Sequence, residues 1–325
     1  METPHLGYSY FAPAVLGAVQ PGLSRAAHVA RVKAAMLRAA QDTLDREGFT
    51  QVVPSLLTST CGACGDPGTL VPVDMGGRQA YLRQTSQLHL EPLMRELGRV
   101  YSISRSFRAE RRIDDRHLAE FTLVEGEAAG WNLDRTMALM ERLVVAMLQQ
   151  ACTSAGQHLT ALGAPRPAQT KAQFARMTYD EAIIALQKRG HFAEWGEDLT
   201  SRHETALTDI VGGPLFVTHY PLGTRFFTMK VRRDDPRVVE CCDLLVPGVG
   251  EVMGASETEH DPDILQSRLE SSASVRQWLD LGGSTQDFDW YLDMHRQQSL
   301  QQAGFGLGFE RLVRYACALK SVSEA

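Results

Sequence analysis

The chain has 325 residues, of which 44% are hydrophobic, and its formal net charge is −6. A chain of this length can bury a large core, as one domain or as one domain with an insertion. The negative net charge excludes a positive electrostatic field over the whole protein that would attract nucleic acid. A local basic groove on the surface is still compatible with this net charge. No apolar run approaches the ~20 residues that span a bilayer, and no secretion signal opens the chain. We therefore expect a cytoplasmic protein.

The six cysteines are scattered along the chain. Without a secretion signal, their thiols are expected to be reduced. Cys61 and Cys64 form a single Cys-x-x-Cys pair, and a structural zinc site would need a second pair, which the sequence does not contain. We therefore expect no zinc site at these cysteines.

The first 23 residues are rich in proline and glycine and predict an irregular arm before one large domain over residues 24–325. Ser24 is a typical N-cap, and apolar residues at helical spacing predict a helix that ends at Gly48. A strand over residues 49–54 is expected next, ended by Pro54. Residues 58–66 predict a loop, and residues 88–97 fit an amphipathic helix.

A hairpin with a charged tip is predicted next. Residues 100–103 and 121–124 are rich in β-branched and aromatic side chains, which favours two antiparallel strands. Guanidinium groups suit phosphate oxygens because they stay charged and offer a planar fork of donors. The alternative is a salt-bridged surface, because acidic residues lie close by. The arginines that crowd the hairpin are Arg105, Arg108, Arg111, Arg112 and Arg116.

The second half of the chain predicts further helices and strands. Asp134 is a candidate N-cap for a helix whose methionines recur at core spacing. Residues 153–173 show little periodicity and predict a connection. Residues 214–221 and 225–230 predict neighbouring strands.

Two later segments contain candidate ligand-binding residues. Asp243 and Glu251 are expected on neighbouring strands joined by a glycine-rich turn, where two carboxylates can share Mg²⁺ with phosphate oxygens. The alternative is a pair of carboxylates in a solvated turn. Gly304, Gly306 and Gly308 then precede a helix, and glycines let a strand backbone approach a ligand closely.

Three segments together resemble the signature motifs of class II aminoacyl-tRNA synthetases. Phe-Arg-Ala-Glu at 107–110 and Arg-His-Leu-Ala-Glu-Phe at 116–121 resemble the second motif of the asparaginyl and aspartyl branch. Residues 24–54 resemble the first motif, and Gly-x-Gly-x-Gly-Phe-Glu-Arg-Leu at 304–312 resembles the third. The resemblance covers roughly residues 24–318. It implies an α/β fold of the α+β type, with an antiparallel sheet flanked by helices, and a homodimer formed through the first motif.

The resemblance also implies a site for ATP and Mg²⁺. A carboxylate attacking the α-phosphorus builds charge on phosphoryl oxygens, which fixed arginines stabilise. No general base is needed, because a carboxylate is already anionic at pH 7. The implied residues are Arg108 for the α-phosphate and the reacting carboxylate, Glu110 for the adenine amino group, Arg116 and His117 for the β- and γ-phosphates, Phe121 and Arg311 for the two faces of adenine, Gly308 beside the nucleotide, and Asp243 and Glu251 for Mg²⁺.

An amino-acid pocket is implied beside the nucleotide, with several departures from the family pattern. Relatives place an arginine that grips the substrate side chain where this chain has Thr258, and a hydroxyl cannot form a bidentate ion pair. Either Arg225 substitutes, or the substrate is neither plain aspartate nor asparagine. Thr258→Arg should then move preference toward aspartate. Asp66 is the only acid near the expected amino-group loop, and Gln301-Gln302 replaces Pro-His. The residues implied for this pocket are Gln87, Glu91, Arg225, Ser256, Thr258 and Gly304.

The residues before the core are too few for the OB-fold that reads the anticodon in this branch. We therefore expect a stand-alone core that activates an amino acid or related carboxylate as an acyl-adenylate and transfers it to ammonia or another non-tRNA amine. One alternative is aminoacylation of tRNA without an anticodon-binding domain. Another is a non-catalytic regulator that binds an amino acid or nucleotide, which the set of phosphate and metal residues disfavours.

Overall fold

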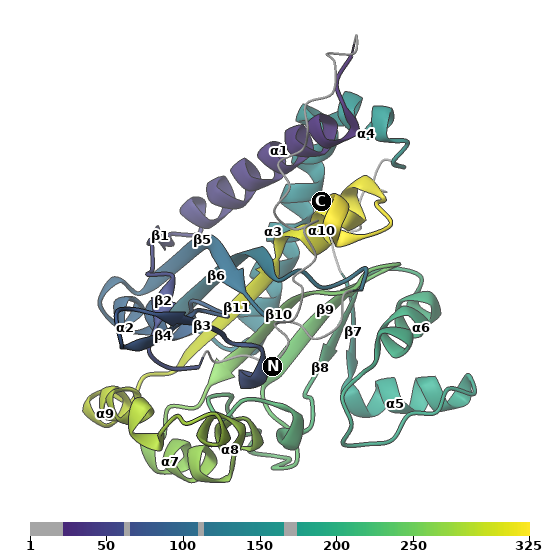
Figure 1. The fold of residues 1–325 in the computed structure, drawn as a ribbon. Coiled ribbons are helices and arrows are strands. Elements are labelled where there is room, and N and C mark those ends of the chain that lie inside the picture. Colours follow the sequence, from purple (N-terminus) through teal and green to yellow (C-terminus); the bar gives the residue numbers. More distant parts are fainter. Residues whose placement is uncertain (1–21, 62–65, 110–113, 166–173) are drawn as a thin grey trace, which may run out of the picture.

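The centre of the protein is an eight-stranded, mostly antiparallel sheet with the order β1-β5-β6-β11-β10-β9-β8-β7 (Figure 1). The computed structural model describes residues 22–61, 66–109, 114–165 and 174–325. Parallel pairing occurs at the two sheet edges, between β1 and β5 and between β7 and β8. The sheet confirms the predicted fold class. Its strands are β1 (Thr50–Gln51), β5 (Arg99–Phe107), β6 (Glu120–Ala129), β7 (Ala175–Thr178), β8 (Leu215–Thr218), β9 (Cys241–Val246), β10 (Gly250–Thr258) and β11 (Gln302–Gly308).

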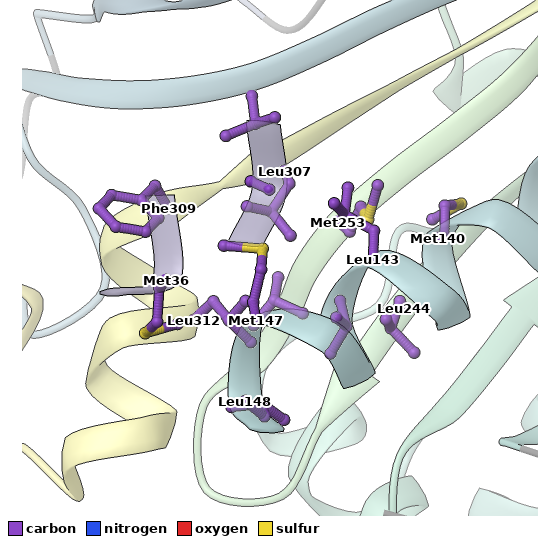
Figure 2. Close-up of a cluster of buried hydrophobic side chains, with 14 of the residues drawn as sticks. Met36, Met140, Leu143, Met147, Leu148, Leu244, Met253, Leu307, Phe309 and Leu312 are labelled. Atoms are coloured by element: carbon purple, nitrogen blue, oxygen red, sulfur yellow. The ribbon is translucent and has the colours of Figure 1, made fainter. Parts of the chain in front are cut away.

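One face of the sheet is covered by α1 (Arg25–Arg46), α3 (Leu133–Ser154) and α10 (Phe309–Cys317), with α4 (Gly156–Leu162) beside α1. The Ser24 hydroxyl caps α1 by accepting from the Ala27 N–H at 3.2 Å, as predicted. Met36, Met140, Met147 and Phe309 lie together in the core between these helices and the sheet (Figure 2). The prediction that the methionines of α3 are core residues is therefore confirmed.

The remaining elements surround the other parts of the sheet (Figure 1). A small sheet has the order β2-β4-β3, and the 3-10 helix Pro67–Thr69 precedes its β3 strand. In the described part of the chain, no helix is long and apolar enough to cross a membrane. The elements are β2 (Leu57–Thr58), β3 (Val71–Asp74), β4 (Gln79–Leu82), α2 (Gln87–Leu97), α5 (Tyr179–Lys188), α6 (Ser201–Val211), α7 (Pro262–Ser271), α8 (Ala273–Asp280) and α9 (Asp289–Gln297).

The predicted hairpin is confirmed. Strands β5 and β6 pair antiparallel from Arg99 opposite Ala128 to Phe107 opposite Glu120. Both strands are longer than the apolar runs suggested, because β6 continues through Glu125 and Glu127, where the sequence is polar. Part of the charged tip, residues 110–113, lies outside the described residues.

A strand over residues 225–230 beside β8 does not form, so this prediction is wrong. Strand β8 pairs with β7 and β9 instead. Residues 225–230 form an isolated bridge, between Met229 and Thr258, in place of a strand, and Phe226 and Phe227 are buried, at 4% and 1% exposure. The Phe227 ring packs against the rings of Phe288 and Tyr291, with centroids 5.4 and 6.2 Å away. Tertiary packing of this aromatic pair therefore overrides its strand propensity.

Three smaller predictions differ from the structure. Helix α3 is capped by Asn132, whose side chain accepts from the Arg135 N–H at 3.1 Å, and Asp134 lies inside the helix. The expected connection over residues 153–173 contains α4. The strand expected over residues 49–54 is reduced to β1, because this sheet edge pairs with β5 over two residues only.

Candidate active site

The site is a pocket of about 370 Å³ on the sheet face that points away from α1 and α3. Alternation along the strands explains its lining, because Met253 and Leu307 enter the core while Gly254 and Gly306 face the pocket. Glu91 and Thr258 are buried but do not line the pocket, and Glu110 lies outside the described residues. The predicted site residues that the pocket brings together are Gln87, Arg108, Arg116, His117, Phe121, Arg225, Asp243, Glu251, Ser256, Gly304, Gly308 and Arg311.

Arginines gather at one end of the pocket. The Arg108 guanidinium carbon lies 5.3 Å from the centroid of the Phe121 ring. Arg311, in the first turn of α10, donates to the side chain of Glu251 at 3.1 Å and to its main-chain carbonyl at 2.9 Å. Burial raises the pKa of Glu251, but Arg311, Arg225 and Arg108 outweigh burial and lower this pKa below its ordinary value. This end can therefore bind several phosphate oxygens while keeping Glu251 anionic.

Asp243 on β9 and Glu251 on β10 converge over Gly254. A Cβ placed on Gly254 would lie 3.3 Å from Asp243 Oδ1 and 3.6 Å from Glu251 Oε1. Burial raises the pKa of Asp243 to about 7, opposed by Arg225 and reinforced by Glu251, Asp198 and Glu204. A divalent cation relieves such repulsion. Among the described residues, no group of three or more His, Cys, Asp or Glu could hold a metal alone. The pair therefore fits Mg²⁺, which takes few carboxylates and completes its shell with phosphate oxygens and water.

Arg225 lies beside this carboxylate pair. Its Nη2 donates to Asp243 Oδ2 at 2.9 Å and lies 3.7 Å from Asp198 Oδ1. Its guanidinium carbon also lies 3.9 Å from the centroid of the Tyr220 ring. Arg225 therefore lines the pocket with its charge already paired to Asp243.

Arg116 and His117 lie in the connection between β5 and β6, shortly before β6 begins. Arg116 donates to Glu204 Oε2 at 2.5 Å, and its Nε has no hydrogen-bond partner in the part of the chain that the structure describes. Glu204 also accepts from the Glu251 N–H at 3.2 Å. The His117 ring contacts Asp114 at 2.8 Å. Glu204 was missed from the sequence, because only the fold brings α6 to the hairpin and to β10.

The opposite end of the pocket is acidic. Glu125 and Glu127 line it, and sequence reasoning missed both. The available signal was spacing, because residues 121, 123, 125 and 127 lie on one face of a strand. Glu125 accepts hydrogen bonds from Thr85 and from the Ser86 hydroxyl and N–H. It is therefore anchored to the segment that precedes α2.

Glu91 supports the pocket wall from behind. It is fully buried, and its carboxylate accepts from the Gln87 side chain at 2.9 Å and from the Gln302 side chain at 2.7 Å. Gln87 is thus held at the pocket by Glu91. Asp66 does not line the pocket, because its side chain caps the 3-10 helix Pro67–Thr69 by accepting from the Gly68 N–H at 2.7 Å.

Ser256, Gly304 and Glu127 lie side by side across β10, β11 and β6. A Cβ on Gly304 would lie only 2.0 Å from Glu127 Oε1, so this glycine makes room for the Glu127 carboxyl. Thr258, two residues after Ser256 on β10, pairs with Gln302 on β11 and is 1% exposed.

Comparison with known proteins decides the family. The model of the family described as tRNA synthetases class II (D, K and N) matches residues 22–325. The chain belongs to this family. The asparagine–tRNA ligase of Desulforamulus reducens is 35% identical over 299 residues, which cover 91% of this chain and 67% of that protein. That of Pyrococcus horikoshii is 37% identical over 306 residues, covering 92% and 67%.

Solved class II synthetases share the architecture of this chain. The crystal structure of asparaginyl-tRNA synthetase from Pyrococcus horikoshii complexed with asparaginyl-adenylate has a TM-score of 0.85 at 35% identity and covers 93% of this chain and 68% of that chain. The Entamoeba histolytica asparaginyl-tRNA synthetase has a TM-score of 0.82 at 27% identity, covering 92% and 66%.

The relatives confirm the prediction of an ATP-dependent, aminoacyl-tRNA synthetase-like ligase. The prediction that the acyl group passes to ammonia or another non-tRNA amine is wrong, because relatives matched over 91% and 92% of the chain are asparagine–tRNA ligases. They support the alternative acceptor, tRNA.

Proposed function

We propose that this synthetase activates asparagine, or an amino acid of similar size, with ATP and transfers it to tRNA. The observation that carries the proposal is the convergence of Arg108, Arg311, Asp243 and Glu251 in one pocket. This arrangement provides donors for phosphate oxygens next to a carboxylate pair suited to Mg²⁺. The names of the relatives supply the amino acid and the acceptor.

The proposed chemistry has two steps. An oxygen of the substrate carboxylate bonds to the α-phosphorus, and the bond from that phosphorus to the bridging oxygen of pyrophosphate breaks. A terminal ribose hydroxyl of tRNA then attacks the activated carbonyl, and AMP leaves. Arg108 would stabilise charge on the α-phosphoryl oxygens. Mg²⁺ held by Asp243 and Glu251 would neutralise phosphate charge, while Phe121 and Arg311 would enclose the adenine.

Three further pocket residues would contact the outer phosphates of ATP and the α-amino group of the substrate. Arg116 would use its Nε, which has no hydrogen-bond partner among the described residues, for the outer phosphates while Glu204 holds its Nη2. His117 would contribute beside it. Gln87, fixed by Glu91, would meet the α-amino group of the substrate.

ATP–pyrophosphate exchange tests the first step and tRNA charging tests the second. We expect asparagine or an amino acid of similar size to support exchange without tRNA, and total tRNA to become aminoacylated when it is added. Exchange without any charged tRNA would contradict the proposed acceptor. Failure of every amino acid to support exchange, with or without tRNA, would contradict the enzyme activity itself.

We also propose a homodimer through the edge of the sheet at β1. Val53, two residues after this edge strand, is 93% exposed, and Leu56 and Leu57 are 43% and 37% exposed nearby. Leu93 and Leu97 expose further apolar surface on α2, whose buried Leu90 and Met94 pack near Val52. Exposed apolar side chains gathered near a sheet edge are typical of an interface, and a second copy would cover them.

Val53→Asp is expected to convert this dimer to monomers, because the carboxylate would lose its hydration at the interface. Analytical ultracentrifugation over a range of concentrations measures the change. Val53→Thr keeps the side-chain shape and should leave most of the protein dimeric. A monomeric wild-type protein, or a variant as dimeric as the wild type, would contradict the proposed interface.

A further inference from the structure

Arg314 is a buried arginine in the last turn of α10, behind the pocket. It is 9% exposed, and it does not line the pocket itself. Taking a guanidinium group out of water is costly unless hydrogen-bond acceptors surround it. The acceptors that surround Arg314 therefore indicate what a buried cation does at this place.

Two of these acceptors belong to Asp115, in the connection between β5 and β6. Arg314 Nη2 donates to Asp115 Oδ2 at 2.7 Å, and Nη1 donates to the main-chain carbonyl of Asp115 at 3.1 Å. The third acceptor is the carbonyl of Leu319, 3.4 Å from Nε. A planar guanidinium that binds both the side chain and the main chain of one residue fixes its position and its orientation. Arg314 therefore joins α10 to this connection.

The residues after α10 hold Asp115 from a second direction. The Val322 N–H donates to the Asp115 carbonyl at 3.0 Å, so this carbonyl accepts from both Val322 and Arg314. Val322 is 1% exposed and lines the pocket. The Asp115 side chain is 57% exposed, so burial does little to hold it. Its position is therefore set mainly by these hydrogen bonds.

Asp115 lies directly before two residues that line the pocket, Arg116 and His117. Helix α10 also contacts the main chain of Arg116, because Arg311 Nε lies 3.4 Å from the Arg116 carbonyl. Arg311 and Arg314 are three residues apart and lie on one face of the helix. The two arginines of α10 therefore hold consecutive main-chain carbonyls of the connection.

The side chain of Arg116 is held separately from its main chain. Its Nη2 pairs with Glu204 on α6 at 2.5 Å, while its Nε has no hydrogen-bond partner within the described ranges. A side chain anchored at one end still moves when its own main chain shifts. A misplacement of about 1 Å in a reacting site can lower the rate about a hundredfold. Control of the main chain at Arg116 is therefore worth as much as the contact with Glu204.

We propose that Arg314 is a positioning residue for phosphate binding, which holds Asp115 so that Arg116 and His117 meet the outer phosphates of ATP and the pyrophosphate product. This inference rests on the phosphate contacts proposed above for Arg116 and His117. A simpler role for Arg314 is to stabilise the carboxyl end of α10, where a cation interacts favourably with the helix dipole. That role would change folding stability and leave phosphate binding unchanged.

Arg314→Met tests the proposal, because it keeps the apolar packing of the side chain and removes its donors. In the exchange reaction, the KM values for ATP and for pyrophosphate should rise about tenfold, as expected when a hydrogen bond to a charged group is weakened. The KM for the amino acid should not change. Arg314→Lys keeps the charge without the planar fork and should recover part of the loss.

Arg296→Met is the matched control. It removes an exposed ion pair with Asp293 at 2.9 Å on α9, outside the pocket, and should change none of these constants.

A double-mutant cycle with Arg116→Ala shows whether Arg314 acts through Arg116. If it does, Arg314→Met should raise the KM for ATP much less in the Arg116→Ala background than in the wild type. Asp115→Ala is a second variant in case Arg314→Met does not fold. It removes a largely exposed side chain and keeps the main-chain contacts, so the same two KM values should rise by a smaller factor.

Equal rises in the KM values for ATP and the amino acid would contradict the proposal, as would unchanged values in folded Arg314→Met or Asp115→Ala. Additive effects of Arg314→Met and Arg116→Ala would leave Arg314 with the helix-end role alone. If no amino acid supports exchange, the proposed function fails, and the thermal shift produced by ATP or pyrophosphate with Mg²⁺ decides the inference. This shift should be smaller in Arg314→Met. Its absence in the wild type would contradict the phosphate site on which the inference rests.

Discussion

Arg108→Ala is expected to abolish ATP–pyrophosphate exchange while leaving the fold intact. Arg108 lines the pocket at the end that holds Arg311 and Glu251, and its guanidinium lies 5.3 Å from the centroid of the Phe121 ring. In the proposed reaction, negative charge grows on the α-phosphoryl oxygens as the carboxylate attacks. Removing one preorganised donor from such a site typically lowers the rate by about 10²–10³-fold, and removing a charged fork should reach the upper end.

Arg105→Ala provides the matched control on the same hairpin. Arg105 is exposed and contacts Glu120 at 3.4 Å, so its removal should have little effect on exchange. Circular dichroism and the thermal midpoint would show whether each variant folds. Normal exchange by a folded Arg108→Ala variant would contradict the proposed role, whereas equal loss in both variants would indicate that the hairpin itself is disturbed.

Local pattern was enough to predict the hairpin and the core methionines, and it placed the two carboxylates on neighbouring strands, whereas their choice as a metal site rested on the family resemblance. The strands of the hairpin are rich in β-branched and aromatic residues, and α3 carries its apolar residues on one face, so their signals lie within short windows. Asp243 and Glu251 were predicted on neighbouring strands from the glycine-rich turn between them, and the structure brings them together over Gly254. In these cases the interactions that decide the structure are close in sequence.

The remaining features depend on contacts between distant segments. The sequence predicted a strand at Phe226 and Phe227, but in the fold Phe227 packs against the distant Phe288 and Tyr291, and Phe226 packs against Phe227. Glu204 approaches Arg116 across 88 residues of sequence, and Gln302 approaches Glu91 across 211. Glu127 has a spacing signal in the sequence, but its place opposite Gly304 follows only from the register of β6 and β11. Side-chain selection in the pocket therefore could not be predicted from the sequence alone.

The same arrangement explains why Arg225 does not simply replace the arginine that the family pattern places at position 258. Its side chain is held by Asp243 on one side and by the Tyr220 ring on the other. Moving Arg225 toward Glu127 would break its ion pair with Asp243, in which the two side chains are only 15% and 18% exposed. Leaving Asp243 buried without its partner would be strongly unfavourable. The two arginine positions are therefore not equivalent.

Glu251→Gln is expected to lower exchange by about a hundredfold or more and to raise the Mg²⁺ concentration that the reaction needs, because a ligand charge is lost where phosphate charge must be neutralised. The substitution keeps the side-chain size, and an amide oxygen can still accept from Arg311, whose main-chain contact to residue 251 at 2.9 Å is unaffected. Exchange rates over a range of Mg²⁺ concentrations measure both effects. Glu194→Gln, exposed and outside the pocket, should leave them unchanged.

Asp243→Asn separates metal binding from positioning of the arginines. An asparagine side chain at this position can still accept from Arg225, but the substitution also removes one of the two charges over Gly254. If Asp243 and Glu251 bind Mg²⁺ jointly, Asp243→Asn and Glu251→Gln should each raise the Mg²⁺ concentration that exchange needs. The double variant should then be little worse than either single variant, because the effects of residues that act as a unit are not additive. Unchanged Mg²⁺ dependence in both single variants would show that these carboxylates orient Arg225 and Arg311 and do not hold the cation.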